Sequence, residues 1–337
     1  MRRVTITDVA RLAGVSKGAV SFALNGRPGV SEATRERVLQ AAADLGWVPN
    51  AAAKALSDGR SHSIGLVMNR PPRLHGIEPL IQHYLEGVQD ELMSHETSLL
   101  IHVVQGHEAE LATYREWAHG RRVDGLVVID LRVDDDRPHA LRALDLPAVV
   151  LGDPRYADGV PSVWTDERAA ADQIVEHLAS LGHRQVARVG DRALLAHAAA
   201  RCAAFEDSCA AAGIDVVELR PESTRPECPE AVPDLLADPH RPTAVLFESD
   251  LKAVAGLATI RGLGLSVPED LSVVAWDTSG IGELLHPPLT SLDHDGRAAG
   301  ARAVRLLLDL LAGDTPTSVQ APTPQLQVRG STGPAPA

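Results

Sequence analysis

The 337-residue chain is poor in the residues that build disulfide scaffolds, membrane spans and aromatic-rich cores. Its three cysteines, Cys202, Cys209 and Cys228, are odd in number and lack metal-ligand spacing, so we expect ordinary reduced thiols. No apolar run could span a bilayer, and Met1 leads into polar residues rather than a signal sequence. The sequence therefore favours a cytoplasmic protein that does not contact a membrane.

Signatures of common enzyme classes are scarce as well. No glycine-rich phosphate loop follows the first strand candidate, and the 14 histidines show no zinc spacing such as His-Glu-x-x-His. The acidic run 134–136 could bind a cation, but three carboxylates in a loop more often form a solvated helix start. We expect no cofactor, no metal and no enzymatic activity.

The amino-terminal region has the pattern of a helix-turn-helix. Thr5 and Asp8 have capping-box spacing at the start of a helix that Gly14 would end. Ser16 is placed to cap a second helix, whose apolar residues would pack on the first. The residues left facing outward, toward a DNA major groove, are Lys17, Gly18, Ser21 and Phe22. Spacing alone fits any short helical hairpin equally well.

The charge distribution favours DNA binding over that alternative. The chain has a net charge of −13, but residues 1–60 hold nine Lys and Arg against five acids, which leaves −17 for the remainder. Phosphate contacts need only a local basic surface, and an acidic body discourages nonspecific wrapping on DNA. A third helix, from Ser31 to a stop at Gly46, would brace the first two.

The amino-acid sequence of this region resembles that of the LacI/GalR family of bacterial transcriptional regulators. The runs that carry the resemblance are Thr5–Ser16, Val20–Ser21, Leu24–Gly26, Val30–Val38 and Leu45–Asn50. The resemblance implies a DNA-binding domain at 1–48, a hinge helix and linker at 49–60, and an effector-binding and dimerisation domain at 61–337.

The same resemblance implies specific DNA contacts. Leu56 matches an apolar wedge that enters the minor groove and bends the operator, and Lys54 would reach a phosphate or the groove floor. Lys17 would meet a guanine edge or a phosphate, while Phe22 would contact a thymine methyl or pack within the head. The full set of expected DNA-binding residues is Thr5, Ser16, Lys17, Gly18, Ser21, Phe22, Asn25, Lys54 and Leu56.

From residue 63 onward, apolar strand candidates alternate with amphipathic helices. The strand candidates are Ile64–Met68, Leu99–Val104, Gly125–Ile129, Ala148–Leu151, Val186–Val189, Val216–Leu219, Ala244–Phe247 and Val273–Trp276. Such alternation predicts parallel sheets with crossover helices, in two α/β lobes. The resemblance implies a periplasmic-binding-protein-like sensor with lobes at 63–160 and 162–289 and late crossovers near Thr290 and Gln320.

Candidate effector ligands lie where strands end, the usual place for ligands in open α/β sheets. Arg201 matches the family's Arg-x-x-Gly-Phe, although Ala204 replaces the glycine. Asp250 matches the second residue of an Asn-Asp pair, with Ser249 in the first place. Each could instead form a salt bridge between the lobes or cap a helix.

Five further candidates are weaker, namely Trp164, His197, Trp276, Asp277 and His294. A tryptophan ring is a natural platform for a sugar face, but a core position explains either tryptophan equally well. His197 lies in the loop before Arg201. Asp277 matches the first acid of the family's Phe-Asp-Asp, and His294 falls where relatives often carry glutamine.

Together these features predict a helix-turn-helix head and hinge helix joined to an α/β sensor of two parallel-sheet lobes. The predicted function is a homodimeric repressor, released from a palindromic operator by a small molecule, with a sugar as the favoured effector. The alternative is a small-molecule sensor that acts through a protein partner. The carboxyl-terminal tail has no leucine heptads, so we expect a dimer rather than a tetramer, and we expect the last few residues to be disordered.

Overall fold

The computed structural model describes residues 4–24, 26, 28–48, 59–70, 79–190, 195–219, 231–238, 240–278 and 280–336. The chain divides into two compact units, Met1–Ser61 and His62–Ala337. The expected hinge helix, with Lys54 and Leu56, lies outside the described residues, as does Asn25. Within the described ranges, no helix is both long and apolar enough to cross a membrane.

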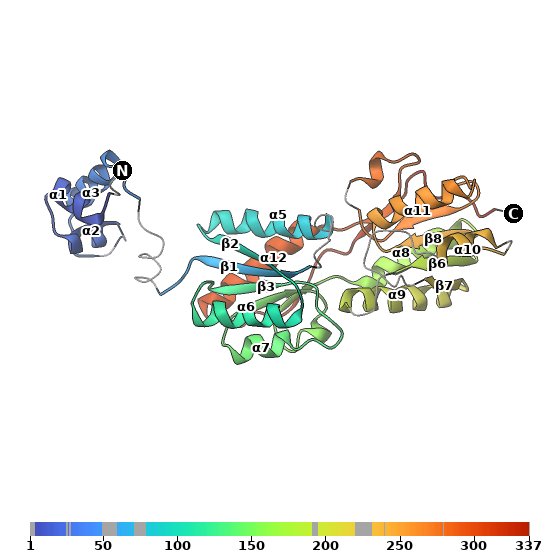
Figure 1. Ribbon diagram of the computed structural model, residues 1–337, viewed down its shortest axis with the longest axis horizontal. Helices are drawn as coiled ribbons and strands as arrows, with labels where there is room; N and C mark the ends of the chain where they lie inside the picture. Colours follow the sequence, from blue (N-terminus) through green and yellow to red (C-terminus); the bar gives the residue numbers. More distant parts are fainter. Residues whose placement is uncertain are drawn as a thin grey trace. The chain divides into compact units, whose positions relative to one another are not determined.

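The first unit is a three-helix head made of α1 (Ile6–Ala13), α2 (Lys17–Leu24) and α3 (Glu32–Asp44) (Figure 1). The capping box is present, because the backbone N–H and the hydroxyl of Thr5 donate to Asp8 Oδ2 at 3.0 and 2.7 Å. Gly14 ends α1 in the left-handed region, at φ +67°, where a side chain would be strained. Ser16 Oγ then accepts from the N–H of Ala19 at 3.1 Å and opens α2.

Small apolar side chains hold the head together. Val9, Val20 and Val38, one from each helix, are fully buried against one another. The predicted third helix is also present, and Ser31 Oγ accepts from the N–H of Thr34 at 3.3 Å at its start. The sequence pattern therefore predicted all three helices of the head.

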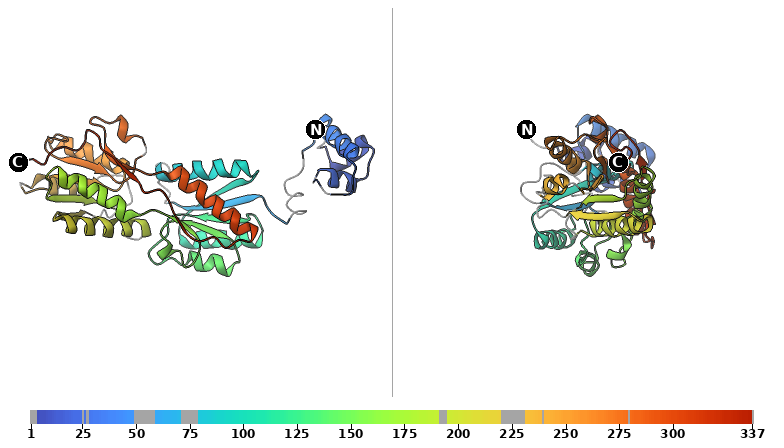
Figure 2. Two further views of the ribbon diagram at one scale, coloured as in Figure 1. Left: turned by 180° about the vertical axis from the view of Figure 1, so that it is seen from behind. Right: turned by 90° about the vertical axis from the view of Figure 1, so that its right-hand side faces the viewer.

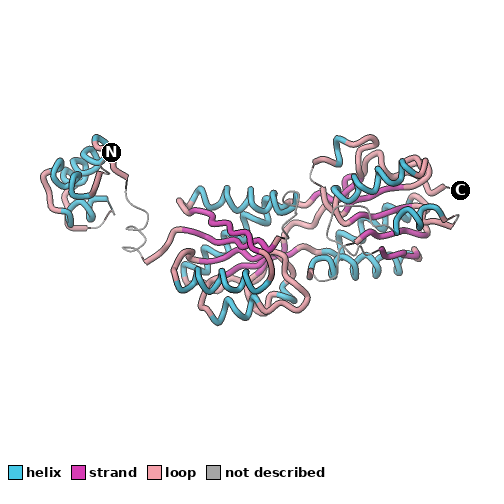
Figure 3. Tube along the Cα trace, viewed as in Figure 1, coloured by secondary structure: helices cyan, strands magenta, loops and turns pink. Residues whose placement is uncertain are grey.

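The second unit contains two lobes, each built on a six-stranded sheet (Figure 3). Lobe 1 has the strand order β11-β5-β4-β3-β1-β2, and its pairs are parallel. Its elements are β1 (Ser63–Asn69), α5 (Pro79–Ser94), β2 (Ser98–Val104), α6 (His107–His119), β3 (Gly125–Val128), α7 (Arg137–Ala143), β4 (Ala148–Leu151), η1 (Pro154–Tyr156), β5 (Ser162–Trp164), α12 (Gly296–Ala312) and β11 (Val319–Gln320). Helices α5 and α12 pack on one face, and α6 and α7 on the other (Figure 2).

Lobe 2 repeats this layered arrangement. Its strand order is β12-β10-β9-β8-β6-β7, and β12 is antiparallel to β10. Its elements are α8 (Glu167–Ser180), β6 (Gln185–Val189), α9 (Ala196–Ala212), β7 (Asp215–Leu219), α10 (Ala231–Ala237), β8 (Ala244–Phe247), α11 (Asp250–Gly262), β9 (Ser272–Ala275), η2 (Gly282–Leu284), β10 (Thr290–Asp293) and β12 (Gln325–Gln327). Helices α8 and α9 cover one face, and α10 and α11 the other.

The chain passes between the lobes slightly later than the sequence indicated. Strand β5, at 162–164, still belongs to the sheet of lobe 1, and β10, at 290–293, belongs to lobe 2. The expected lobe boundaries at 160 and 289 were therefore a few residues early. Short strands at these points carry too few apolar residues to be recognised by pattern alone.

The expectation of a disordered tail is wrong for the residues described. Ser331 is fully buried, and its carbonyl accepts from the N–H of Val273 at 2.8 Å. Further along, the N–H of Ala335 donates to the carbonyl of Leu181 at 2.9 Å. The tail is ordered because it satisfies backbone groups of lobe 2 that would otherwise be unpaired.

Candidate DNA-binding and effector sites

The head presents part of α2 to solvent. Lys17 and Gly18 are exposed, and Phe22 keeps 42% of its surface accessible. The ring of Phe22 also lies 3.3 Å from the position that a Cβ would take on Gly29, so one edge packs within the head. Packing within the head therefore describes part of the surroundings of Phe22, and its contact with a thymine methyl stays a prediction. An exposed aromatic ring on this helix is available to a thymine methyl.

Two other expected DNA contacts already have structural roles. The hydroxyls of Thr5 and Ser16 form the capping bonds of α1 and α2, although both residues are exposed. Ser21 is partly buried. Capping does not prevent a phosphate contact, because a backbone N–H at a helix start can bind a phosphate oxygen.

The candidate effector site is centred on Arg201, which projects from α9 in lobe 2 and is only 5% exposed as a side chain. Its guanidinium lies 3.1 Å from Glu248 Oε1, 3.2 Å from Asp277 Oδ1 and 3.4 Å from Glu167 Oε2. The guanidinium also stands over the Trp276 ring, 5.5 Å from its centroid. Arg201 thus joins acids that come from three separate parts of lobe 2.

The topology explains why these groups meet. Glu248 and Asp277 come just after β8 and β9, which are adjacent parallel strands, so both carboxylates lie at the carboxyl edge of the sheet. Glu167 is the first residue of α8, and its carboxylate accepts from the Trp276 indole N–H at 3.2 Å. The carboxyl edge of the lobe 2 sheet, where ligands bind in open α/β sheets, therefore carries charged side chains that strands and helices hold in place.

A second arginine extends this network along the sheet. Arg188, on β6, is 1% exposed and donates to Glu218 at 2.7 Å. It also donates to Glu248, which it shares with Arg201. One buried carboxylate therefore serves two buried guanidinium groups, which fixes the position of both.

Burial and neighbouring charges shift the pKa values of the site. Burial raises the pKa of Glu167 from 4.5 to about 7, although the nearby Arg201 opposes the change. Burial alone would lower the pKa of Arg201, but Asp277, Glu167 and Glu248 hold it well above its usual value. Glu167 can therefore gain or lose a proton near neutral pH, while Arg201 stays charged.

His294 is held at the same edge in its neutral form. Burial lowers its pKa, and Asp277 only partly offsets that effect. Its Nε2 lies 3.1 Å from the carbonyl oxygen of Trp276 and 3.1 Å from Asp277 Oδ1. A neutral imidazole with the proton on Nε2 would donate to the Trp276 carbonyl.

Four of the seven predicted effector residues are brought together, namely Arg201, Trp276, Asp277 and His294. Asp250 is buried at the first position of α11, where the preceding Ser249 caps the helix by accepting from the N–H of Lys252 at 3.4 Å. His197 lies on α9, one turn before Arg201, rather than in a loop. Trp164 ends β5, in the sheet of lobe 1.

Sequence reasoning missed four charged partners, Glu167, Arg188, Glu218 and Glu248, and one aromatic residue, Tyr84. Glu248 directly follows a strand and Glu167 opens a helix, so their positions carried a usable signal. Arg188 sits inside an apolar strand and Tyr84 inside an amphipathic helix, where nothing in the pattern indicates a site. Tyr84, on α5 of lobe 1, lies close enough for Arg201, Asp277 and Glu167 of lobe 2 to influence its pKa, which burial raises.

Lobe 1 contributes charges of its own near the carboxyl ends of its strands. Arg70, just after β1, pairs with Asp130 at 2.6 Å. Among the described residues, the buried Nε and Nη2 of Arg70 have no hydrogen-bond partner. Arg70 thus has donors that a ligand could use.

The acidic run that could have bound a cation has a different role. The side chain of Asp135 is fully buried and bonded to the guanidinium of Arg137, which also pairs with Glu110 at 2.5 Å. Asp136 accepts from His107 at 2.6 Å. Only Asp135 is therefore held by a buried base, whereas Asp134 and Asp136 are exposed and Asp136 stands at the N-cap position of α7, as expected for a helix start.

Backbone contacts join the lobes beside the candidate site. Residues 132 and 195 form an isolated antiparallel bridge, and the N–H of Ala196 donates to the carbonyl of Leu131 at 2.8 Å. Since Ala196 begins α9, the helix that carries Arg201, this contact links the site directly to lobe 1.

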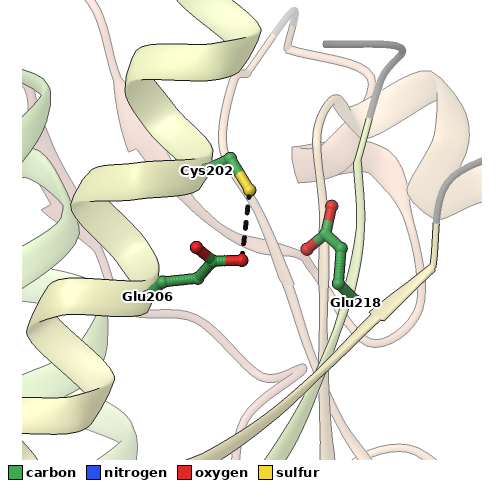
Figure 4. Close-up of side chains that lie close together, drawn as sticks. All are labelled: Cys202, Glu206 and Glu218. Atoms are coloured by element: carbon green, nitrogen blue, oxygen red, sulfur yellow. Dashed lines mark hydrogen bonds between the residues drawn. The ribbon is translucent and has the colours of Figure 1, made fainter.

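Among the residues that the structure describes, one group of side chains could hold a metal ion. Cys202 and Glu206, four residues apart on α9, lie 3.5 Å apart, and Glu218 faces them from β7 (Figure 4). Their potential ligand atoms lie within 4.8 Å of one another. The sequence spacing did not indicate this group, because Glu218 comes from another element. Arg188 already holds Glu218, however, which weakens the case for a cation there.

A helix-turn-helix head followed by a two-lobed α/β sensor, with a buried charged site at the strand ends, defines a class of ligand-responsive DNA-binding regulators. Residues 5–50 match the bacterial regulatory proteins of the lacI family, and residues 175–332 match the periplasmic binding protein-like domain. The chain is 32% identical to the HTH-type transcriptional regulator CelR of Thermobifida fusca, over 95% of both chains. It is 33% identical to AglR of Rhizobium meliloti (strain 1021), over 99% of this chain and 95% of that protein.

Solved structures agree with these relatives. The lac repressor dimer bound to operator and the anti-inducer ONPF superposes with a TM-score of 0.84 at 28% identity, covering 98% of this chain and all of that one. A CelR–cellobiose complex gives 0.69 at 28% identity, with the same coverage. The chain belongs to the LacI family of bacterial regulatory proteins and is a DNA-binding transcriptional regulator rather than an enzyme.

Proposed function

We propose that this regulator is a homodimeric repressor that leaves a palindromic operator when a carbohydrate binds between its two lobes. The observation that carries the proposal is the buried Arg201, held by Glu167, Glu248 and Asp277 at the strand ends of lobe 2. Carboxylates accept from adjacent sugar hydroxyls, and a fixed guanidinium donates to hydroxyl and ring oxygens. Trp276 lies against Arg201 in the same group, although its full burial favours a supporting role over stacking on a sugar.

Residues from both lobes support binding between the two lobes. Tyr84 and Arg70 of lobe 1 would complete a site whose other side is the Arg201 group. Asp250, His197 and Trp164 remain expected ligands at its margin. A ligand that contacts both lobes favours one lobe arrangement over another, and that difference is all that coupling to the head requires.

Two solved relatives support a sugar and an operator as the ligands of this chain. One solved relative is named as a CelR–cellobiose complex, and another as a lac repressor dimer bound to operator. By analogy, the head would read the operator through Lys17, Ser21 and Phe22 on α2, with Thr5, Ser16, Gly18 and Asn25 close to the backbone. Lys54 and Leu56 would act from the hinge.

An edge strand of lobe 1, which pairs on one side only within the described part of the chain, supports the dimer. Strand β2 ends the sheet of lobe 1 and exposes Ile101 and Val103, which are 40% and 58% accessible. Met93, at the end of the neighbouring α5, is 70% accessible. Apolar side chains on an unpaired edge are a hazard unless a partner covers them, and a second copy is the partner that a palindromic operator requires.

The experiment that tests the proposal has two parts. Sedimentation of the full chain, alone and with its operator, should give two copies per operator. Fluorescence anisotropy should then show release of the operator by one of a panel of sugars. The variant Arg201→Ala should still bind the operator but should no longer respond to that sugar. A monomer on DNA, or an unchanged response in the variant, would contradict the proposal.

If the protein were instead a sensor acting through a protein partner, the same assay would separate the two functions. The full chain would bind the sugar but would show no discrete operator. Its family membership makes that result unexpected.

A further inference from the structure

The segment that follows β3 is fixed in place by a buried arginine. Arg137, at the start of α7, is 3% exposed, and its guanidinium donates to the backbone carbonyls of Ile129 at 3.2 Å and Asp130 at 2.6 Å. The remaining N–H groups donate to Asp135, at 2.7 and 3.0 Å, and to Glu110 at 2.5 Å. All five donors of the guanidinium are therefore used, and only an arginine has a fork of donors that makes this set of bonds.

The two acids that bind Arg137 are held by further hydrogen bonds. Glu110 is buried on α6 and also accepts from the Tyr114 hydroxyl at 2.7 Å. Asp135 accepts from the backbone N–H of Arg132 at 2.8 Å, which closes the loop between these two residues. The guanidinium therefore joins α6, α7 and residues 129–132 into one rigid part of lobe 1.

The same segment contacts the start of α9, a helix of lobe 2. The carbonyl of Leu131 accepts from the N–H of Ala196 at 2.8 Å, and Arg132 forms a backbone bridge with Leu195. Ala196 is 2% exposed and lies in the same hydrophobic cluster as Leu131, whose other buried members all belong to lobe 1. The first residue of α9 is thus packed in lobe 1, although the helix belongs to lobe 2.

The later turns of α9 are packed on lobe 2. Ala204, Phe205 and Cys209 lie in the hydrophobic cluster between α8 and the lobe 2 sheet. The chain itself crosses between the lobes after β5, β10 and β11, so the start of α9 is a further, noncovalent connection. Arg201 lies between the two anchored parts of α9, about 7.5 Å along the helix axis from Ala196. A rotation of one lobe against the other therefore acts on the part of α9 that carries Arg201.

We propose that Arg137 is a positioning residue for the effector response, because it holds the start of α9 against lobe 1 and so couples the Arg201 group to the angle between the lobes. The inference rests on the proposed effector site between the lobes and adds how binding there is transmitted. A ligand that contacts Arg201 contacts a helix whose first residue moves with lobe 1. Without this anchor, α9 would follow lobe 2 alone, and the same ligand would discriminate less between the two lobe arrangements.

Two substitutions break the anchor from opposite sides. Arg137→Lys keeps the buried positive charge, but the ammonium group cannot span two carbonyls and two carboxylates. Ala196→Pro removes the N–H that Leu131 accepts, at the first position of α9, where proline suits a helix and where Leu195 already has the extended backbone that precedes proline. The matched controls are Arg142→Lys, at an exposed position of α7, and Ala196→Gly, which keeps the N–H.

Amide hydrogen exchange of the full-length protein, followed by mass spectrometry, measures whether α9 is anchored. In Arg137→Lys and Ala196→Pro, exchange over residues 199–203 should be at least about 10-fold faster than in wild type, with no change in β1 or in either control. Unchanged exchange at the start of α9 in both variants would overturn the inference. A rise of the same size in β1 would assign Arg137 a general structural role and would overturn it as well.

Operator release measures the coupling itself. Fluorescence anisotropy gives the operator affinity without sugar and with saturating glucose, galactose, cellobiose, maltose or lactose, and the ratio of the two affinities is the response. For a sugar that releases wild type, Arg137→Lys and Ala196→Pro should reduce this ratio about 10-fold and keep the affinity without sugar within about 2-fold. Both controls should keep the wild-type ratio.

Failure of the proposed function would look different from failure of this inference. If none of these sugars released the wild-type protein from its operator, the carbohydrate effector would be overturned, while faster exchange confined to the start of α9 would still support the anchor. If a sugar released wild type and released both anchor variants equally well, the effector would stand and the inference alone would fail.

Discussion

Glu167 gives the sensor a pH dependence that can be calculated from its surroundings. Its pKa is about 7 in the folded chain, against 4.5 for an ordinary glutamate, because burial disfavours the carboxylate. Between these two pH values, the folded protein holds a proton that the unfolded chain has lost. The stability that this proton supplies is full below pH 4.5 and disappears as the pH rises through 7.

The size of the effect follows from the shift. A difference of about 2.5 pH units corresponds to about 3 kcal/mol of unfolding free energy. Glutamine resembles the protonated acid at every pH, so Glu167→Gln should be close to wild type at pH 4.5. Relative to wild type, the variant should gain about 3 kcal/mol between pH 4.5 and pH 7.5.

Urea unfolding of the full chain, followed by far-ultraviolet circular dichroism from pH 4.5 to pH 8, measures this difference. The sensor transition should be read separately from that of the head. Glu176→Gln, at the exposed position on α8, is the matched control and should track wild type throughout. If the curves for Glu167→Gln and wild type stayed parallel over this range, the desolvation argument for Glu167 would be refuted.

Three further substitutions test the head, the hinge and the lobe 1 core. Gly65→Ala should destabilise the sensor by about 2 kcal/mol or more in urea unfolding, because its Cβ would lie 2.4 Å from the Trp117 ring, whereas Gly262→Ala, which meets nothing within 4 Å, should not. Ser31→Ala removes the acceptor that caps α3 and should cost the head about 1 kcal/mol in thermal unfolding, while an unchanged melting temperature would contradict that role. Leu56→Ala should weaken operator binding and reduce DNA bending in a circular-permutation gel assay, and equal bending by both proteins would rule out a wedge.

The head was predictable from sequence because its signals are local. Thr5, Ser16 and Ser31 are caps within three residues of the groups they bind, and Gly14 is needed at a left-handed turn. The eight strand candidates of the sensor were also confirmed to within a residue or so, since buried parallel strands are almost wholly apolar. Local chemistry and hydrophobic pattern were sufficient in both cases.

The remaining parts depend on contacts between distant residues. Strands β11 and β12 contain two and three residues and are defined by the strands they join. The tail is ordered through His183, whose Nε2 contacts the carbonyl of Gly333 at 3.2 Å, some 150 positions away. No window along the sequence contains both partners of such a bond.

The candidate site also contains some residues that the sequence could indicate and others that it could not. Arg201 and Asp277 lie in sequence motifs that resemble those of the family, and Trp276 and His294 lie beside expected strand ends. Tyr84 could not be identified, because its proximity to lobe 2 follows from how the lobes pack. In the sequence, Arg188 is a charge inside an apolar strand, which is unfavourable by itself. In the structure, Glu218 and Glu248 pair with it.

The proposed repressor leaves its operator when a sugar binds. Genome-wide mapping of its DNA sites, followed by binding to the recovered site with each sugar added, tests that claim most directly. We expect a palindromic site that the full chain binds and that one sugar releases. Discrete operator binding that no sugar alters, or tight sugar binding without any discrete DNA site, would contradict it.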